Sequence, residues 1–359
     1  MKILIVAPLA HPEQLTSGSH FPPSQAQFFW ERSLRKAGHE VDAFIRNTPA
    51  LVGMRLRRSE RFTGNKLATV FTALSQRFPR WQPDYHARNR RLLEKVRAWR
   101  PDVILLTGDN RVIFTETLAE IKRRYGCKIV YLSGVSPIVF STPNERAAAP
   151  LYDLVLVNDY YHGVQWLELG AARMEALPIV ACDPEFHHPY AVEVQAAVGF
   201  VGTLLPDHLY STRVTALEAV KDLGLGVWSI HALPASLQDC YRGPALGEAM
   251  LRAVCASKIQ VNPHGNFMRW GGNMRLFEAA ACGVFQITDD RPGIPTWFTV
   301  GEQIVTFRDP AHLRDLVRHY LRADDERAQI AAAAREHVYA HHTYDHRMQA
   351  LVELVAALP

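Results

Sequence analysis

The sequence has 359 residues, of which 48% are hydrophobic and 21% are charged. These values are typical of a globular chain with two ordinary domains, and every apolar run is shorter than the roughly 18 residues that a membrane-spanning helix needs. The N-terminus becomes polar too soon for a secretory signal. The five cysteines form no CxxC pair, which argues against a disulfide framework or a zinc site, so we expect a cytoplasmic protein.

Charge is unevenly distributed along the chain. The net charge is +4, yet residues 51–100 hold 11 Arg and 2 Lys against Glu60, Asp84 and Glu94, a local charge of +10. Such a segment is either the solvated face of a helix or a surface that meets an anionic acceptor or the periphery of an anionic membrane. A nucleic-acid partner is not expected, because no recognition motif accompanies the charge.

Strands and helices alternate in the first half of the chain. Apolar runs that end in turn residues predict strands, and amphipathic runs that end in glycine predict helices. In chain order we expect strand 2–9, helix 25–38, strands 40–45 and 101–109, helix 114–126, and strands 127–134, 152–159 and 176–180. Segment 181–195 has two prolines and no clear periodicity, so it predicts a linker.

The alternation restarts after this linker. In chain order we expect strand 197–204, helix 211–224, strand 225–231, helix 246–258, strand 259–265, a short helix that ends at Gly283, strands 284–290 and 303–307, and two helices within 309–342. The pattern predicts two α/β domains, each with a parallel, doubly wound sheet and with ligands at the carboxyl ends of its strands. Gly18, Gly108 and Asp109 follow strands in this way, and the Gly18 loop is a candidate to meet a phosphate or an acceptor.

The stretch RWGGNMRLFEAAACG (269–283) carries the clearest chemical signal. Gly271 and Gly272 permit close approach of the backbone, and the amides of the following helix suit an anion. Asn273 is a candidate cap for that helix. Arg275 lies in the first turn, where a cation needs a compensating carboxylate or anionic ligand. Glu278 is placed either to accept from ribose hydroxyls or simply to pair with Arg275 on the surface.

A second candidate anion site follows strand 197–204. Gly202 and Thr203 form a turn, and Arg213 lies in the next predicted helix. This arrangement suits phosphates, although a lone arginine in an amphipathic helix is more commonly solvated.

The order of several motifs resembles the C-terminal domain of GT-B glycosyltransferases, most of all the spore maturation CgeB-like branch of group 1. The motifs are GFVGTL, YRGPALGEAM, SKIQVNPHG, GGNMRLFEAAACGVFQITDD, PTWFTVGEQIVTFRDPAHL and HTYDHRMQALV, and they cover roughly residues 197–356. The resemblance implies two Rossmann-like domains, 1–180 and 196–344, facing across a cleft, with linker 181–195 and a helix at about 345–359 that returns to the first domain.

The resemblance also implies a transferase that takes a sugar from a nucleotide-sugar donor, with UDP the expected carrier, bound by the second domain. Glu278 matches the carboxylate that holds the ribose, and Arg213 matches a basic residue near the diphosphate. The other implied donor contacts are Gly202, Thr203, Tyr241, Arg242, His264, Gly271, Gly272, Asn273, Met274 and Arg275. Trp270 departs from the pattern, because many relatives place a sugar-binding glutamate there; Asn262 and His264 are candidate replacements.

The chemistry of transfer must be completed by the first domain. If the enzyme inverts, a base is required, and the candidates are Asp109 and His20; Asp109 could equally cap a helix and His20 could simply be solvated. No metal or other cofactor is expected, because arginines and amides can stabilise the leaving diphosphate and no D-x-D motif is present. His341, His342 and His346 are expected to pack at a hinge rather than bind a metal. The competing functions are a nucleotide-sugar epimerase of the same fold and a non-catalytic nucleotide-sugar binding protein.

Overall fold

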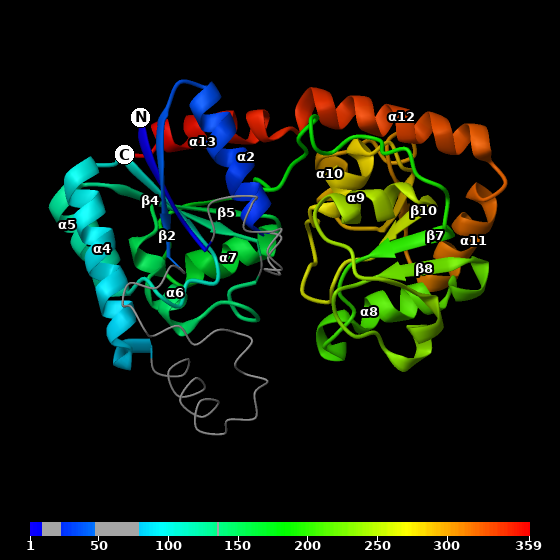
Figure 1. The fold of residues 1–359 in the computed structure, drawn as a ribbon, viewed down its shortest axis with the longest axis horizontal. Coiled ribbons are helices and arrows are strands. Elements are labelled where there is room, and N and C mark those ends of the chain that lie inside the picture. Colours follow the sequence, from blue (N-terminus) through cyan, green and yellow to red (C-terminus); the bar gives the residue numbers. More distant parts are fainter. Residues whose placement is uncertain (9–22, 47–78, 135) are drawn as a thin grey trace.

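Two parallel β-sheets, one in each half of the chain, organise the computed structural model (Figure 1). The structure describes residues 1–8, 23–46, 79–134 and 136–359. The first sheet has the strand order β2-β1-β3-β4-β5-β6 and the second β12-β11-β10-β7-β8-β9. The predicted fold class, α/β with two Rossmann-like domains, is therefore confirmed.

The first sheet is covered on both faces by helices. Its strands are β1 (Lys2–Ala7), β2 (Glu40–Ile45), β3 (Val103–Thr107), β4 (Lys128–Ser133), β5 (Leu154–Val157) and β6 (Met174–Glu175). Its helices are α2 (Pro23–Lys36), α4 (Pro83–Trp99), α5 (Thr115–Tyr125), α6 (Pro143–Ala147) and α7 (Tyr160–Glu168), with 3-10 turns η2 (Pro79–Trp81) and η3 (Ala149–Leu151). Along β1 the side chains alternate: Leu4 packs in the same core as α4 and α5, whereas Ile5 packs in the same core as α2.

The second sheet has the same layered plan. Its strands are β7 (Ala196–Val201), β8 (Leu225–Trp228), β9 (Tyr241–Gly243), β10 (Ser257–Asn262), β11 (Gln286–Asp289) and β12 (Val305–Phe307). Its helices are α8 (Asp207–Glu218), α9 (Glu248–Cys255), α10 (Arg275–Ala281), α11 (Pro310–Tyr320) and α12 (Asp324–His341), with 3-10 turns η4 (Lys221–Leu223), η5 (Ala235–Cys240) and η6 (Ile294–Thr296). Helix α8 packs on one face of this sheet with α11, while α9 packs on the other with the end of α10.

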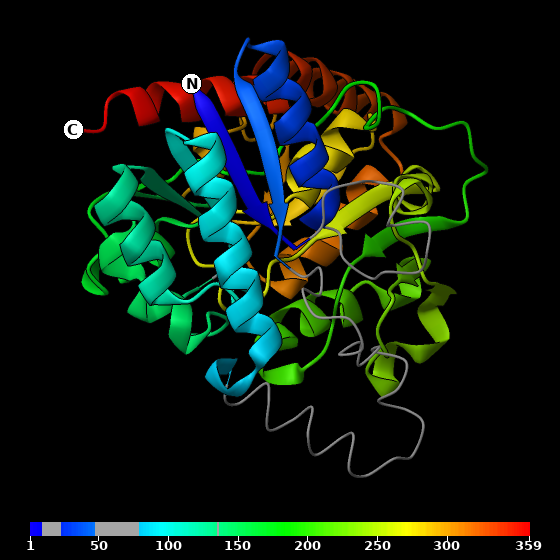
Figure 2. The ribbon, with the colours of Figure 1, turned by 60° about the vertical axis from the view of Figure 1, so that its left-hand side comes forward.

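The chain returns to the first domain at its end. Helix α13 (Tyr344–Ala356) packs beside α2, as Figure 2 shows, and contributes Met348 and Leu351 to that domain's core. Two crossing segments meet where it begins, because the Cys182 amide donates to the His342 carbonyl (3.0 Å) and the Tyr344 amide donates to the Cys182 carbonyl (3.0 Å). Linker and returning helix are thus joined by backbone hydrogen bonds.

Two local predictions differ from the structure. The sixth strand of the first sheet is the two-residue β6, and segment 176–180 lies outside it; Pro178 has no amide to donate to a sheet. The segment Tyr241–Gly243, expected to be a loop, is instead the edge strand β9. A three-residue strand is too short for its periodicity to be recognised in the sequence.

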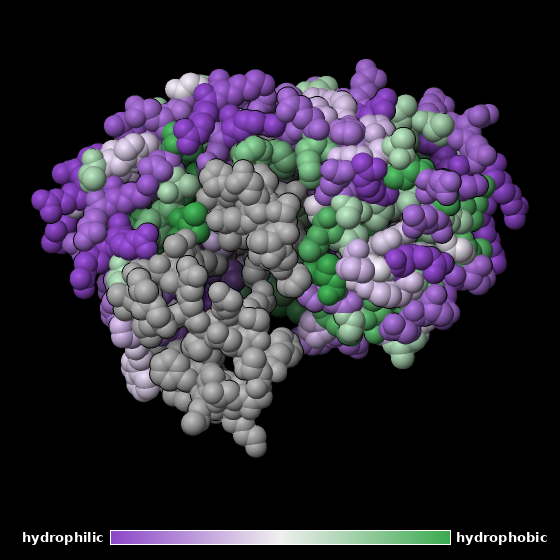
Figure 3. All heavy atoms as spheres, viewed as in Figure 1, coloured by the Kyte–Doolittle hydropathy of each residue, from purple (hydrophilic) through white to green (hydrophobic). Residues whose placement is uncertain are grey.

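Part of the basic segment 51–100 is helix α4. Its Leu92 and Val96 are buried in the core, and the outer surface around α4 and α5 is mostly hydrophilic (Figure 3). Several of its cations have partners, for example Lys95 with Asp42 at 2.6 Å. This part fits the solvated-face interpretation, while residues 51–78 lie outside the described residues. Within the described ranges, no helix combines the length and apolar character needed to cross a bilayer.

The predicted hinge histidines lie where α12 meets α13. The His342 ring is buried; its Nε2 donates to the Trp297 carbonyl (3.0 Å) and its Nδ1 accepts from Arg347 (2.8 Å). Burial, with help from the adjacent Arg347 cation, lowers the pKa of His342 to about 3. Among the described residues, no group of three or more His, Cys, Asp or Glu side chains is arranged to hold a metal.

We expect His342→Gln to flatten the pH dependence of stability in acid. The pKa of His342 is about 3 in the folded protein against 6.5 ordinarily, so the unfolded chain binds the extra proton. The free energy of unfolding should therefore fall as pH drops from 6.5 towards 3, by up to about 1.4 kcal/mol per pH unit from this group. Urea unfolding at several pH values measures the slope. The exposed neighbour variant His341→Gln should keep the wild-type slope, and equal slopes in the two variants would contradict the assignment.

Candidate functional site

The second sheet has a topological switch point between its two central strands. Strands β7 and β10 are neighbours, but the chain leaves β7 towards α8 on one face and leaves β10 towards α10 on the other. The loops that follow the two strands therefore diverge and leave a crevice at the carboxyl edge of the sheet, where open α/β sheets bind their ligands. The predicted donor residues Gly202, Thr203 and His264 all lie in these two loops.

Arg213 connects the two loops. Its Nε donates to the Pro263 carbonyl after β10 (2.7 Å), and its Nη1 donates to the Thr203 carbonyl after β7 (2.7 Å). The side chain is only 8% exposed and lies against the rings of Phe200 and Tyr210, with Cζ 5.4 and 4.9 Å from their centroids. The expectation of a solvated arginine is thus wrong.

The charge of Arg213 has no carboxylate partner, since none of the ion pairs among the described residues includes it. Burial lowers the pKa of Arg213 to about 10; Tyr210 and Asp289 oppose this, and Arg275 adds to it. The Arg213 guanidinium is buried and bound only to carbonyls, and Arg275 is close enough to lower its pKa by charge repulsion. The crevice therefore carries positive charge. Such a charge favours an anion there.

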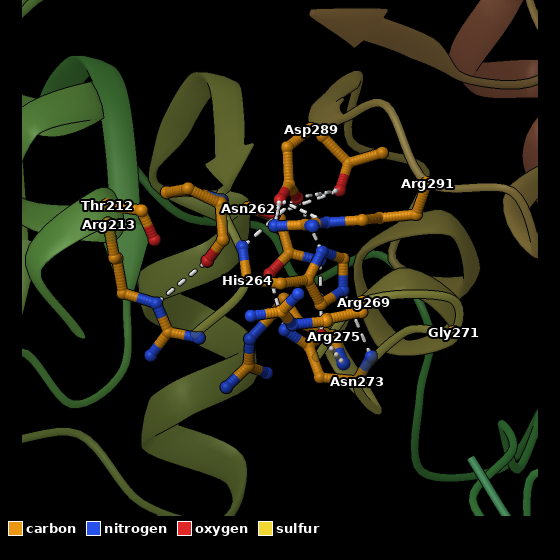
Figure 4. Close-up of polar contacts among 12 residues, drawn as sticks. Thr212, Arg213, Asn262, His264, Arg269, Gly271, Asn273, Arg275, Asp289 and Arg291 are labelled. Carbon is orange, nitrogen blue, oxygen red and sulfur yellow. Dashed lines mark hydrogen bonds and ion pairs between the residues drawn. The ribbon is translucent and has the colours of Figure 1, made fainter. Parts of the chain in front are cut away.

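His264 and Asp289 stabilise the loop on the other side of the crevice (Figure 4). The His264 Nε2 accepts from the Asn273 amide (3.1 Å), so its Nδ1 carries the proton and donates to Asp289 (2.5 Å). Arg291 completes the group with a 2.6 Å ion pair to Asp289. Burial acts to raise the pKa of Asp289, but His264 and Arg291 outweigh it and hold that pKa well below its ordinary value.

Asn262 and His264 are not free to replace the missing sugar-binding glutamate, so that prediction needs correction. The side chains of Asn262 and Asn273 exchange two hydrogen bonds (2.9 and 3.1 Å), and Asn262 also donates to Gln286 (3.0 Å). His264 uses both ring nitrogens within the protein and is 1% exposed. These side chains instead fix the shape of the segment before α10. The Asn273 Oδ1 also accepts from the Arg275 amide (2.9 Å), but α10 begins at Arg275 with Met274 at its N-cap, so Asn273 lies one residue before the predicted capping position.

Arg275 and Glu278 do pair, at 2.5 Å, but the carboxylate is 3% exposed rather than on the surface. His187, from the linker, lies with its Nε2 3.8 Å from the other carboxylate oxygen of Glu278. Because the His187 Nδ1 accepts from the Asp183 amide (2.9 Å), the ring proton is on Nε2 and faces Glu278. Burial acts to raise the pKa of Glu278, but Arg275 and His187 outweigh it and lower that pKa. The first-turn arginine is thus compensated within the protein.

Gly271 and the two residues before it bind an anion, but the anion belongs to the protein. The amides of Arg269, Trp270 and Gly271 all donate to Oδ2 of Asp159, from the first domain, at 2.7, 2.7 and 3.0 Å. Gly272 faces inward, where an added Cβ would lie 2.1 Å from Leu276. The expectation that both glycines face a diphosphate is therefore wrong for this conformation, because these positions are filled by neighbouring parts of the chain.

Tyr241 and Arg242 lie two strands away from β7, on β9 at the edge of the same sheet. Both side chains are exposed, and the Tyr241 hydroxyl donates to the Ser229 carbonyl (3.2 Å). The structure thus brings together the residues around Arg213, His264 and Arg275. It places Tyr241 and Arg242, which the family resemblance matches to the region that receives the base, apart from them along the carboxyl edge.

The first domain carries a cavity of about 280 Å³ at the carboxyl ends of β3 and β4. It is lined by Asp109, Arg111, Tyr131, Ser133, Phe140, Ser141, Glu145 and Trp166. Asp109 has a φ of 57° and a side chain that is 66% exposed, with a 3.1 Å ion pair to Arg111. It does not cap a helix, because α5 begins at Thr115 with Phe114 at its N-cap. The other candidates in this domain, His20 and Gly18, lie outside the described residues.

Several residues at these sites were not singled out from the sequence. Asp159 follows strand β5 just as Asp109 follows β3, so the same signal of a polar residue at the end of a strand was present. Asp289 gave the same signal at the end of β11, although its partner His264, 25 residues away, could not be read from it. His187 gave no such signal, because its partner lies 91 residues away along the chain. Only the fold brings them to Glu278 and His264.

Residues 203–353 match a family model described as "Glycosyl transferase-like". The structure is similar to sucrose-phosphate synthase from Thermosynechococcus elongatus, with 11% identity, a TM-score of 0.64 and coverage of 99% of this chain and 98% of that chain. It is similar to HepE from Anabaena in complex with UDP-glucose, with 13% identity, a TM-score of 0.63 and full coverage of both chains. A glycosyltransferase from Rickettsia africae matches with 10% identity, a TM-score of 0.60 and coverage of 99% and 98%. No curated protein matches the sequence.

These similarities extend over both domains and establish the GT-B fold, including the helix that returns to the first domain. They do not separate the CgeB-like branch from other branches, so the branch stays a prediction.

We expect Asp289→Asn to destabilise the protein by about 3 kcal/mol, because it removes the negative charge from a largely buried ion pair and replaces one of the two oxygens that accept from His264 and Arg291 with an NH₂ donor. Urea unfolding measures the change. The exposed neighbour variant Asp290→Asn is the control and should stay within about 0.5 kcal/mol of the wild type. A loss for Asp289→Asn no greater than that of the control would show that the ion pair contributes little.

Proposed function

We propose that this protein is a glycosyltransferase that moves a sugar from a nucleotide-sugar donor, with UDP as the carrier, to a hydroxyl of an acceptor. The match of residues 203–353 to a glycosyl transferase-like model supports the reaction class. The structural similarity to HepE, whose structure contains UDP-glucose, supports the choice of carrier.

Arg213 is the observation that carries the proposal. It bridges the loops after β7 and β10 at the switch point, and it has no carboxylate partner among the described residues. A diphosphate in the crevice would supply the missing negative charge for Arg213, whereas Arg275 is already paired with Glu278. As the bond between the sugar and the diphosphate breaks, negative charge grows on the leaving group, so Arg213 stabilises the transition state more than the bound donor.

In the proposed reaction an acceptor hydroxyl oxygen attacks the anomeric carbon, and the bond from that carbon to the diphosphate oxygen breaks. The diphosphate leaves with the bonding electron pair, and Asp109 accepts the hydroxyl proton. We propose that no metal takes part, since Arg213 supplies positive charge to the diphosphate. Transfer should then persist in EDTA, and activity that EDTA removes and Mg²⁺ or Mn²⁺ restores would contradict this point.

The cavity beside Asp109 is the proposed acceptor site. Tyr131, Phe140 and Trp166 give it an aromatic wall, while Asp109 and Arg111 are its exposed charged residues. Its second carboxylate, Glu145, accepts from the Tyr131 hydroxyl (2.6 Å) and from the amides of Asn110 (2.8 Å) and Thr142 (2.6 Å). Three donors already bind this carboxylate, so it holds the shape of its site and leaves Asp109 as the exposed carboxylate of the lining. One exposed carboxylate favours a transferase over an epimerase that needs two active carboxyls.

Thermal unfolding with UDP, GDP, dTDP and CDP tests the donor site. A nucleotide at 100 times its Kd should stabilise the native protein by about 2.7 kcal/mol, which is roughly 5–11 °C for domains of this size, and UDP should give the largest rise. Arg213→Ala should abolish the rise, and Arg213→Lys should retain part of it. Arg318→Ala, an exposed arginine on α11, is the control. If no nucleotide raises the Tm of the wild type, the proposed function is wrong.

We expect Asp109→Asn to lower kcat for transfer by about 100-fold or more, because general bases contribute about 10²–10⁴-fold, while the UDP-induced rise in Tm is unchanged. Coupled detection of released UDP measures the rate. Glu116→Gln removes an exposed carboxylate of the same domain outside the cavity and should not change kcat. A normal rate in Asp109→Asn would transfer the role of base to another group, and UDP binding without transfer to any acceptor would favour a non-catalytic binding protein.

A further inference from the structure

The two domains are joined by a buried carboxylate in front of α7. Asp159 follows β5 and is 0% exposed. Its Oδ1 accepts from the Tyr161 amide (3.0 Å) and caps α7 within the first domain. Its Oδ2 accepts from three consecutive amides of the second domain, 269–271, at 2.7, 2.7 and 3.0 Å. Each carboxylate oxygen of Asp159 therefore accepts hydrogen bonds from a different domain.

Further contacts surround this carboxylate. The buried His162, one turn into α7, lies with Nε2 2.9 Å from the Phe267 carbonyl, which can only accept, so the ring donates across the domain boundary. Phe140 packs edge-on against the Phe267 ring with centroids 4.8 Å apart. Tyr160 lies against Trp270 at 6.1 Å. Segment 267–271 of the second domain thus contacts the first domain through four of its five residues, 267, 269, 270 and 271.

The close approach of the first domain explains why residue 271 is a glycine. A Cβ added to Gly271 would lie 1.6 Å from the carbonyl oxygen of Asn158 and 3.0 Å from Cα of Asp159. Its backbone conformation is not one that only glycine adopts, since it has no positive φ. The constraint on this residue therefore comes from the first domain and exists only while the two domains are in contact.

The contact links the two halves of the proposed active site. On one side, segment 269–271 leads directly into Asn273 and Arg275 at the donor crevice. On the other side, α7 carries Trp166 into the wall of the first-domain cavity, and Phe140, which touches Phe267, lines the same cavity. Water can solvate both the carboxylate and the amides when the domains separate, so the contact can break without leaving a buried charge.

We propose that Asp159 is a positioning residue that closes the second domain onto the first by binding the 269–271 amides. Its effect on transfer rests on the proposed function, whereas its effect on the domain contact does not. The closed contact brings the donor crevice to the Asp109 cavity, so Asp159 acts on catalysis through the distance between the two substrates rather than by touching either one.

The physical test compares Asp159→Asn and Gly271→Ala with the wild-type full-length protein. The asparagine keeps the shape and the cap of α7 but removes the negative charge from the amides, and the alanine inserts a methyl group where the Asn158 carbonyl lies. Both variants should show a larger radius of gyration in small-angle X-ray scattering and faster amide hydrogen exchange in a peptide spanning 267–272. Asp309→Asn, which removes the charge from a helix cap (2.8 Å to the His312 amide) within the second domain alone, should change neither.

The kinetic test separates closure from donor binding. If UDP binds the second domain as proposed, both variants should keep its Kd within about threefold while kcat for transfer falls by about 10- to 100-fold, the loss expected from one charge-assisted hydrogen bond. Asp159→Glu, which keeps the charge on a longer side chain, should recover part of the rate. Unchanged scattering and exchange in both variants would overturn the proposal. Wild-type protein without UDP binding or transfer would overturn the proposed function alone, because the scattering and exchange results would still decide the role of Asp159.

Discussion

The relation between the two domains depends on a buried anion that neither domain can satisfy by itself. Oδ1 of Asp159 caps a helix of the first domain, while Oδ2 is bound only by amides of the second. While the domains are in contact the carboxylate is shielded from water, and a buried carboxylate is costly without donors, so the closed contact requires these amides. That contact determines the distance between the crevice around Arg213 and the cavity beside Asp109. The crevice and the cavity each lie at the carboxyl ends of the parallel strands of their own sheet.

The same principle of charge compensation explains the donor side. Most charged groups near α10 find partners within the protein: Arg275 with Glu278, and Asp289 with Arg291 and His264. Arg213 has only carbonyl partners and aromatic neighbours. The other buried charges of this region have partners of opposite charge within the protein. Arg213 has no carboxylate partner, which indicates that the negative charge of a ligand lies beside it. This contrast among neighbouring arginines supports a diphosphate at the switch point.

Regular secondary structure could be predicted well because it depends on local patterns. The buried runs of β1 and β3 and the amphipathic runs of α2 and α5 lie within a few residues of their expected positions, and the order of elements sufficed for the fold class. Segment 176–180 and strand β9 were assigned wrongly because short elements at sheet edges have too few residues for a period. At the site, the sequence identified Arg213, Arg275 and Glu278 as notable residues but could not tell which of them were already paired.

The sequence by itself determined the layered α/β architecture and marked the segment around Gly271 as suited to an anion, because these follow from periodicity and backbone freedom. The tertiary structure decided which anion meets that segment. Asp159 lies 110 to 112 residues from the amides that it binds, and a contact over that distance is set by how two sheets and their helices pack, which no local pattern records. The same holds for His187 beside Glu278 and for the carbonyls that hold Arg213 across the crevice.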